Sequence, residues 1–136
     1  MFLLDTNIIS EMVKKTPNAG VMNKLELHQD KLFTAAPVWH ELNFGCQRLP
    51  ASSRKKQLEI FLETVIRQTM GILPYDATVA ALHAAERARL SATGKTPSFV
   101  DGQIAAIAMI NNLTLVTRNL NDFKLFKKLS LENWFV

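Results

Sequence analysis

Short apolar runs alternate with longer segments of helical periodicity along almost the whole chain. The first run, Phe2–Leu4, stops at Asp5, and apolar residues from Ile8 to Val13 then recur at helical spacing. Further runs cover residues 32–36, 71–74 and 113–117, with residues 134–136 as a candidate terminal strand. Runs that are apolar at every position are typical of strands buried on both faces, and helical crossovers make such strands parallel. We therefore expect a three-layer α/β domain over residues 1–136, in which helices cover both faces of a short-stranded parallel sheet.

Turn and cap residues predict where the helices begin. Pro17 suits the first turn of an amphipathic helix through residues 21–27. Asp76 or Thr78 starts a long alanine-rich helix, and Ser98 precedes a second helix rich in alanine and isoleucine. The remaining helices are expected over residues 38–47 and from Ser52 or Ser53 through Ile66. No linker or internal repeat separates these elements, which is the organisation expected of one domain.

The chain is net basic, with 16 Lys and Arg against 12 Asp and Glu, a net charge of +4 and a pI near 9.4. A basic surface favours a polyanionic partner without naming one. The single cysteine, Cys46, excludes an internal disulfide and a site of several thiolates, so a reducing cytoplasm is the expected compartment. No apolar run approaches the roughly 18–20 residues that span a bilayer, and no secretory leader precedes Asp5. We expect a cytoplasmic protein that does not bind membranes.

Acidic and amide residues follow the predicted strands at the points where the strands end. Asp5 ends the first strand, and Asn119 and Asp122 directly follow the fourth. Because parallel strands end at one edge of a sheet, these three side chains are expected at the same edge. Glu41 and Asp101 lie near the starts of helices and reach that edge if their helices begin there.

Carboxylates that converge repel one another, so a site of this kind needs a cation. Mg²⁺ or Mn²⁺ suits oxygen ligands, whereas zinc is disfavoured because the chain has one cysteine and three scattered histidines. A hard metal ion that faces a polyanion favours hydrolysis of phosphodiester bonds, since it activates water and neutralises charge on the phosphate. The candidate metal ligands are Asp5, Glu41, Asp101 and Asp122, with Asn119 beside them as a further catalytic candidate.

Each of these residues also has a structural interpretation. Asp5 could cap the helix that follows it, and both Ser98-x-x-Asp101 and Asn119-x-x-Asp122 match a capping pattern. Glu41 fits a structural role least, because it lies among apolar residues of its segment, where an unpaired carboxylate would be costly. Taken singly these residues are more often structural, but their placement together at one sheet edge favours a site.

Four segments follow one another in a fixed order: residues 3–10 (LLDTNIIS), 40–42 (HEL), 101–108 (DGQIAAIA) and 115–123 (LVTRNLNDF). Together they resemble the PIN domain, and more narrowly the VapC toxins of bacterial type II toxin–antitoxin systems. The resemblance extends over nearly the whole chain, and residues 72–76 (ILPYD) also fit it. It implies a PIN-like α/β fold.

The resemblance implies a Mg²⁺- or Mn²⁺-dependent endoribonuclease that is inhibited by a cognate VapB-type antitoxin, with transfer RNA as one candidate substrate. It carries over Asp5, Glu41 and Asp101 as the core acidic residues. The chain departs from the family pattern at Asn119, because a fourth acid often stands two residues after the strand-ending threonine. Either Asn119 or Asp122 therefore completes the site.

The resemblance also implies partners. Family members form homodimers, and toxin and antitoxin together bind operator DNA through the antitoxin. The C-terminal segment of the antitoxin covers an apolar groove, whose walls we expect at residues 8–13 and 21–27. For the RNA, Arg118, Lys14 and Lys15 are the leading candidates for phosphate contacts, which position RNA without reading its sequence.

Two other functions fit parts of the pattern. A signalling receiver domain is also α/β with clustered Asp residues, but the run at 32–36 does not end in Asp and the run at 113–117 is followed by Arg118 where a Lys is needed. A catalytically weak PIN-fold module that binds RNA or a protein partner is favoured only by Asn119 in place of an acid. Metal-dependent RNA cleavage separates the hydrolase from both alternatives.

Overall fold

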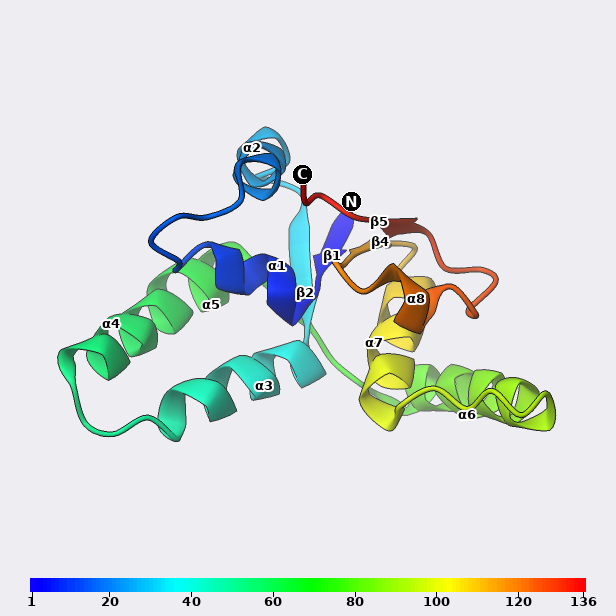
Figure 1. The fold of residues 1–136 in the computed structure, drawn as a ribbon. Coiled ribbons are helices and arrows are strands. Elements are labelled where there is room, and N and C mark those ends of the chain that lie inside the picture. Colours follow the sequence, from blue (N-terminus) through cyan, green and yellow to red (C-terminus); the bar gives the residue numbers. More distant parts are fainter.

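The structure, a computed structural model, describes residues 1–136 and is built on a five-stranded sheet (Figure 1). The strand order is β3-β2-β1-β4-β5, and every neighbouring pair is parallel. The strands are β1 (Phe2–Leu4), β2 (Leu32–Ala35), β3 (Gly71–Leu73), β4 (Thr114–Val116) and β5 (Leu131–Glu132). The expected short-stranded parallel sheet is confirmed, and the first four strands match their predicted ranges to within one residue at each end.

The last strand differs from the prediction. Residues 134–136 form no strand, and β5 lies earlier, where Leu131 pairs with Leu115 of β4. Trp134 is buried and packs its ring against Phe2, with the ring centroids 5.2 Å apart. The apolar C-terminal run therefore indicated a buried aromatic side chain packed against β1 rather than a strand paired in the sheet.

Helices of the first half of the chain gather on one side of β1 and β2, where α3, α4 and α5 lie together (Figure 1). These helices are α1 (Thr6–Glu11), α2 (Ala19–Leu27), α3 (Ala36–Gln47), α4 (Ser53–Phe61), the π-helical segment η1 (Leu62–Ile66) and α5 (Arg67–Thr69). The predicted helical position of Pro17 is wrong. Asn18 is the N-cap of α2, and its Oδ1 accepts a hydrogen bond from Val21 N at 3.2 Å, so Pro17 lies outside the helix.

The second half supplies α6 (Ala77–Ala92), α7 (Phe99–Ile110) and α8 (Leu120–Phe123), and α6 and α7 lie on the opposite side of β1 and β2 (Figure 1). The predicted caps are confirmed, since Asp76 Oδ1 accepts from Val79 N at 3.0 Å and Ser98 Oγ accepts from Asp101 N at 3.1 Å. Residues 104–108 of α7 are all buried, and their alanines let this helix lie close to the sheet. None of the helices combines the length and the apolar character needed to cross a membrane.

One edge of the sheet carries every strand's carboxyl end, because all pairings are parallel. Asp5 follows β1 and Thr117 follows β4, while α1 and α3 begin directly after their strands. The first turn of α7 lies at the same edge, as Figure 1 shows. The fold therefore brings three helix starts and two strand ends to one place.

Candidate active site

Asp5 is the most rigidly held of the predicted acids. Its side chain is buried, Oδ1 accepts from Thr6 N at 2.8 Å, and Oδ2 accepts from Thr117 Oγ1 at 2.8 Å. Burial raises the pKa of Asp5 above its ordinary value, the charge of Glu41 adds to the rise, and the hydrogen bonds from Thr117, Thr6 and Asn7 oppose it. Asp5 is thus the N-cap of α1, which confirms the capping interpretation, and its carboxylate is held in a fixed orientation. Its role as a metal ligand stays a prediction.

A small polar network joins the ends of β1 and β4 around Asp5. Thr117 is fully buried, and its Oγ1 accepts from Asn119 N at 3.1 Å while donating to Asp5. Asn7 Oδ1 accepts from Arg118 N at 3.0 Å, and Asn7 Nδ2 lies 3.4 Å from Thr117 Oγ1. The sequence motifs contained Asn7 and Thr117, but they were not predicted as site residues. Both residues could have been predicted from their positions, because Asn7 lies just after β1 and Thr117 just after the neighbouring β4.

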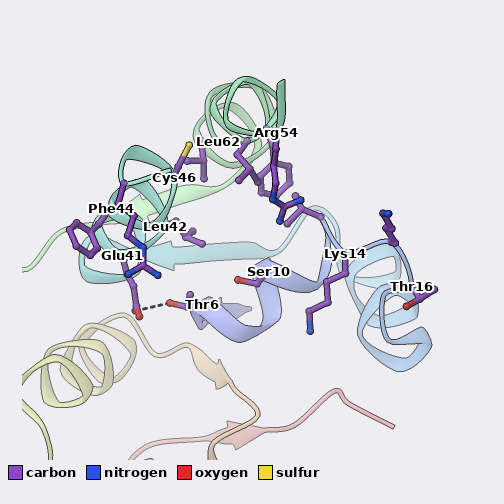
Figure 2. Close-up of a pocket in the computed structure, with 16 residues that line it drawn as sticks. Thr6, Ser10, Lys14, Thr16, Glu41, Leu42, Phe44, Cys46, Arg54 and Leu62 are labelled. Atoms are coloured by element: carbon purple, nitrogen blue, oxygen red, sulfur yellow. Dashed lines mark hydrogen bonds between the residues drawn. The ribbon is translucent and has the colours of Figure 1, made fainter. Parts of the chain in front are cut away.

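Glu41 lies in the second turn of α3 and is bound to α1. Its Oε2 accepts from Thr6 Oγ1 at 3.0 Å, so Thr6 joins Asp5 through its backbone and Glu41 through its hydroxyl (Figure 2). The expectation that Glu41 lies in apolar surroundings is wrong, because Glu41 is exposed and its neighbour Phe44 is 57% exposed. Val38 of this segment is fully buried, whereas Trp39 and Leu42 are only half-buried.

Asp101 lies in the first turn of α7 and is half-buried. Its backbone N–H donates to Ser98 Oγ, which caps α7. Burial is the main cause that raises the pKa of Asp101, and the hydrogen bond with Ser98 opposes it. The negative charges of Asp122, Asp5 and Glu41 raise the pKa further. The carboxylate of Asp101 therefore lies within the electric field of all three other predicted acids.

Asn119 and Asp122 are both exposed beside β4. The capping interpretation of Asn119 is wrong, because its side chain caps nothing and only its backbone oxygen accepts from Asp122 N, at 3.1 Å. The charge of Asp122 acts on Asp101, whereas Asn119 brings only a neutral amide and a backbone contact to Thr117. These contacts favour Asp122 as the fourth charged residue of the edge.

The donor set suits a hard divalent cation. All of its groups are oxygen donors, and two of them, Asp5 and Asp101, have pKa values raised by burial and by neighbouring carboxylates, a penalty that a cation would relieve. No three His, Cys, Asp or Glu side chains lie close enough together to ligate one ion directly. Mg²⁺ keeps several of its waters and needs only one or two carboxylates, so the residues fit Mg²⁺ better than a fully dehydrated ion.

Glu41 separates two cavities. The larger, of about 800 Å³, lies between α1, α3 and α4 and is called the α1/α3/α4 groove below (Figure 2). Its basic side chains are Lys14, Lys15, Arg48 and Arg54, and its apolar ones include Val13, Leu42, Phe44, Leu58 and Phe61. Of the two segments predicted to wall the antitoxin groove, residues 8–13 contribute Ser10 and Val13 to this cavity, whereas α2 contributes none and turns Val21 and Leu25 into the core. The antitoxin groove itself stays a prediction.

The predicted phosphate-binding residues fall into two places. Lys14 and Lys15 line the α1/α3/α4 groove, and Lys14 is ion-paired with the buried Glu11. Arg118 lies outside that groove, with its guanidinium 4.5 Å from the ring centre of Phe135. Basic side chains therefore gather in this groove. The groove lies beside the sheet edge that carries Asp5, Glu41, Asp101 and Asp122, which we call the acidic edge.

Comparisons with known proteins agree with this architecture. The family model for the PIN domain matches residues 2–129. The toxin FitB of Neisseria gonorrhoeae is 36% identical over 126 residues, which cover 90% of this chain and 91% of FitB. The VapC ribonuclease Y4jK of Sinorhizobium fredii is 30% identical over 127 residues, or 91% of each chain.

Solved structures give the same result. A chain of FitAB bound to the IR36 DNA fragment superposes with a TM-score of 0.91 at 31% identity, covering 100% of this chain and 97% of that one. VapBC2 from Rickettsia felis, bound to a fragment of promoter DNA, gives 0.82 at 29% identity, with 98% of each chain covered. The chain therefore belongs to the PIN-domain family, among the VapC- and FitB-type toxins of toxin–antitoxin systems.

Proposed function

We propose that this chain is a Mg²⁺- or Mn²⁺-dependent endoribonuclease toxin that hydrolyses phosphodiester bonds of RNA, with transfer RNA as one candidate. The observation that carries the proposal is the acidic edge, where Thr6 bonds both Asp5 and Glu41, and where Glu41 and Asp101 line the same cavity. Relatives that carry the name VapC ribonuclease support it. Residues 1–136 act as one catalytic domain.

The carboxylates of Asp5 and Asp101 are the primary holders of the metal, with Glu41 and Asp122 beside them. When bound, the metal ion supplies charge neutralisation at the phosphate and lowers the pKa of the attacking water. Thr117 and Thr6 keep Asp5 in one orientation through hydrogen bonds of 2.8 Å each. Only Oε2 of Glu41 accepts the Thr6 hydroxyl, which leaves Oε1 to orient water or take up a proton.

Lys14, Lys15, Arg48 and Arg54 of the α1/α3/α4 groove contact RNA phosphates. The apolar part of the same groove takes the C-terminal segment of a VapB-type antitoxin, which then blocks access to Glu41. The active chain is a homodimer, and it reaches operator DNA only through the antitoxin. Solved complexes of relatives, FitAB and VapBC2 bound to DNA, support these partners.

The test is cleavage of a transfer RNA pool by the purified chain with Mg²⁺, with Mn²⁺ and with EDTA. We expect EDTA and Asp101→Asn to abolish cleavage, since the amide keeps the size of the side chain but loses its charge. Asp30→Asn is the matched control, because Asp30 is exposed and precedes β2 at the opposite edge of the sheet. Full metal-dependent cleavage by Asp101→Asn would refute the site. Tight RNA binding without turnover at saturating Mn²⁺ would instead indicate the non-catalytic RNA-binding module.

A further inference from the structure

A second cavity, of about 610 Å³, lies on the other side of Glu41, between the first turns of α3 and α7. We call it the α3/α7 cavity. Glu41 and Asp101 line it, so any group that enters lies directly beside the acidic edge. Its size is in the range of small-molecule binding sites.

The two cavities differ sharply in charge. Four basic side chains line the α1/α3/α4 groove, whereas no Lys or Arg lines the α3/α7 cavity, which carries two carboxylates. A phosphate there would lie beside both carboxylates with no Lys or Arg to pair with. The other walls are the rings of Tyr75 and His40, the amide of Gln103 and three small apolar residues, Ala36, Pro37 and Val100. A flat, uncharged group with hydrogen-bonding edges suits these walls.

Tyr75 is held in place by a buried partner. Its hydroxyl lies 2.8 Å from Nδ1 of His83, which is 3% exposed. Burial lowers the pKa of His83, so the imidazole is neutral and places no positive charge behind the cavity. His83 in turn packs on Phe99, with ring centroids 4.8 Å apart, and on Gly102, where a Cβ atom would come within 2.7 Å of His83 Cδ2.

A packed connection therefore runs from Asp101, through the adjacent Gly102 and His83, to Tyr75. We propose that the α3/α7 cavity receives one nucleobase of single-stranded RNA next to the scissile phosphate. Tyr75 stacks on the base and Gln103 bonds to its edge, so both act as specificity-determining residues rather than catalytic ones. This inference rests on the proposed ribonuclease function.

The decisive experiment sequences the cut sites that the full chain makes in a pool of single-stranded RNA of random sequence. Wild type should favour certain bases at one position beside the cut. Tyr75→Ala should lower cleavage about tenfold, and its base preference should relax because the base is no longer held against Gln103. Gln103→Ala should change which base is preferred, and Tyr75→Phe should give an intermediate loss because the ring stays while its bond to His83 is lost. Ile60→Ala, at an exposed apolar residue of α4 that lines neither cavity, should keep the wild-type base preference.

Thermal unfolding of each variant checks its fold, and if Tyr75→Ala is unfolded, Tyr75→Phe and Gln103→Ala decide the question. A wild-type base profile in the folded Tyr75 and Gln103 variants overturns the inference while leaving the ribonuclease function intact.

If the wild type cuts no RNA, the proposed function fails, and nucleoside binding to the cavity is then measured separately. Tyr75 is the only tyrosine, so its labelled ring gives one NMR signal. That signal should shift with adenosine, cytidine or uridine and not with ribose 5-phosphate, and the absence of any nucleoside shift overturns the inference.

Discussion

Replacing Thr117 with valine removes one hydroxyl from the centre of the acidic edge and leaves the volume of the side chain nearly unchanged. That hydroxyl donates to Asp5 Oδ2 at 2.8 Å, and both residues are buried, so water has little room to replace it. A hydrogen bond to a charged group contributes about 1.5–3 kcal/mol. We therefore expect Thr117→Val to lower the free energy of unfolding by about 2 kcal/mol at neutral pH, and Tm by about 4–8 °C.

Urea unfolding of wild type and variant measures this difference. Thr114→Val is the matched control, because Thr114 begins β4, the strand that Thr117 follows, is half-buried and makes no side-chain hydrogen bond. It should change the free energy of unfolding by no more than about 0.5 kcal/mol. Equal losses in the two variants would show that the Thr117 hydroxyl does not support Asp5.

The pH dependence gives a second check. The hydrogen bond from Thr117 lowers the pKa of Asp5 against the larger effect of burial, so the variant should raise that pKa further. A bond to the ionised carboxylate stabilises the fold above the pKa of Asp5 and is lost as the pH falls through it. The stability gap between wild type and Thr117→Val should therefore be widest at neutral pH and narrow in acid. A gap that stays constant would contradict this reasoning.

Three further measurements concern the same edge of the sheet. Asp101→Asn should raise the free energy of unfolding at neutral pH, because folding raises the pKa of Asp101 above 3.8 and so penalises its ionised form. This gain should vanish as the pH falls towards 3.8, and a loss at neutral pH would contradict the charge argument. Mg²⁺ or Mn²⁺ should raise the Tm of wild type but not of Asp101→Asn, whereas an equal rise in both would place the ion elsewhere. Gly102→Ala should cost about 1–3 kcal/mol in urea unfolding, since its Cβ would press on the ring of His83, and an unchanged stability would refute that contact.

Local signals in the chain predicted the elements that depend on local physics. The run Phe2–Leu4 indicated a buried strand, and Asp76 and Ser98 indicated helix starts, because strand burial and capping act over a few neighbouring residues. Two predictions were wrong for the opposite reason: that Glu41 has apolar surroundings and that residues 134–136 form a strand. An apolar neighbourhood in the sequence does not say which segment packs on it. Glu41 and Phe44 stay exposed, while Trp134 packs on Phe2.

The sequence by itself determined that Asp5, Asn119 and Asp122 lie at one edge, since buried apolar runs joined by helices make parallel strands and parallel strands end together. Only the tertiary structure decided which side chains touch there. The bond from Thr117 to Asp5 joins residues 112 positions apart, and the bond from Thr6 to Glu41 joins residues 35 apart. Such contacts depend on strand order and on how each helix lies against the sheet. The same packing decided that the Tyr75 hydroxyl contacts His83 and that Tyr75 lines one cavity with Asp101. No local pattern in the sequence predicts these contacts.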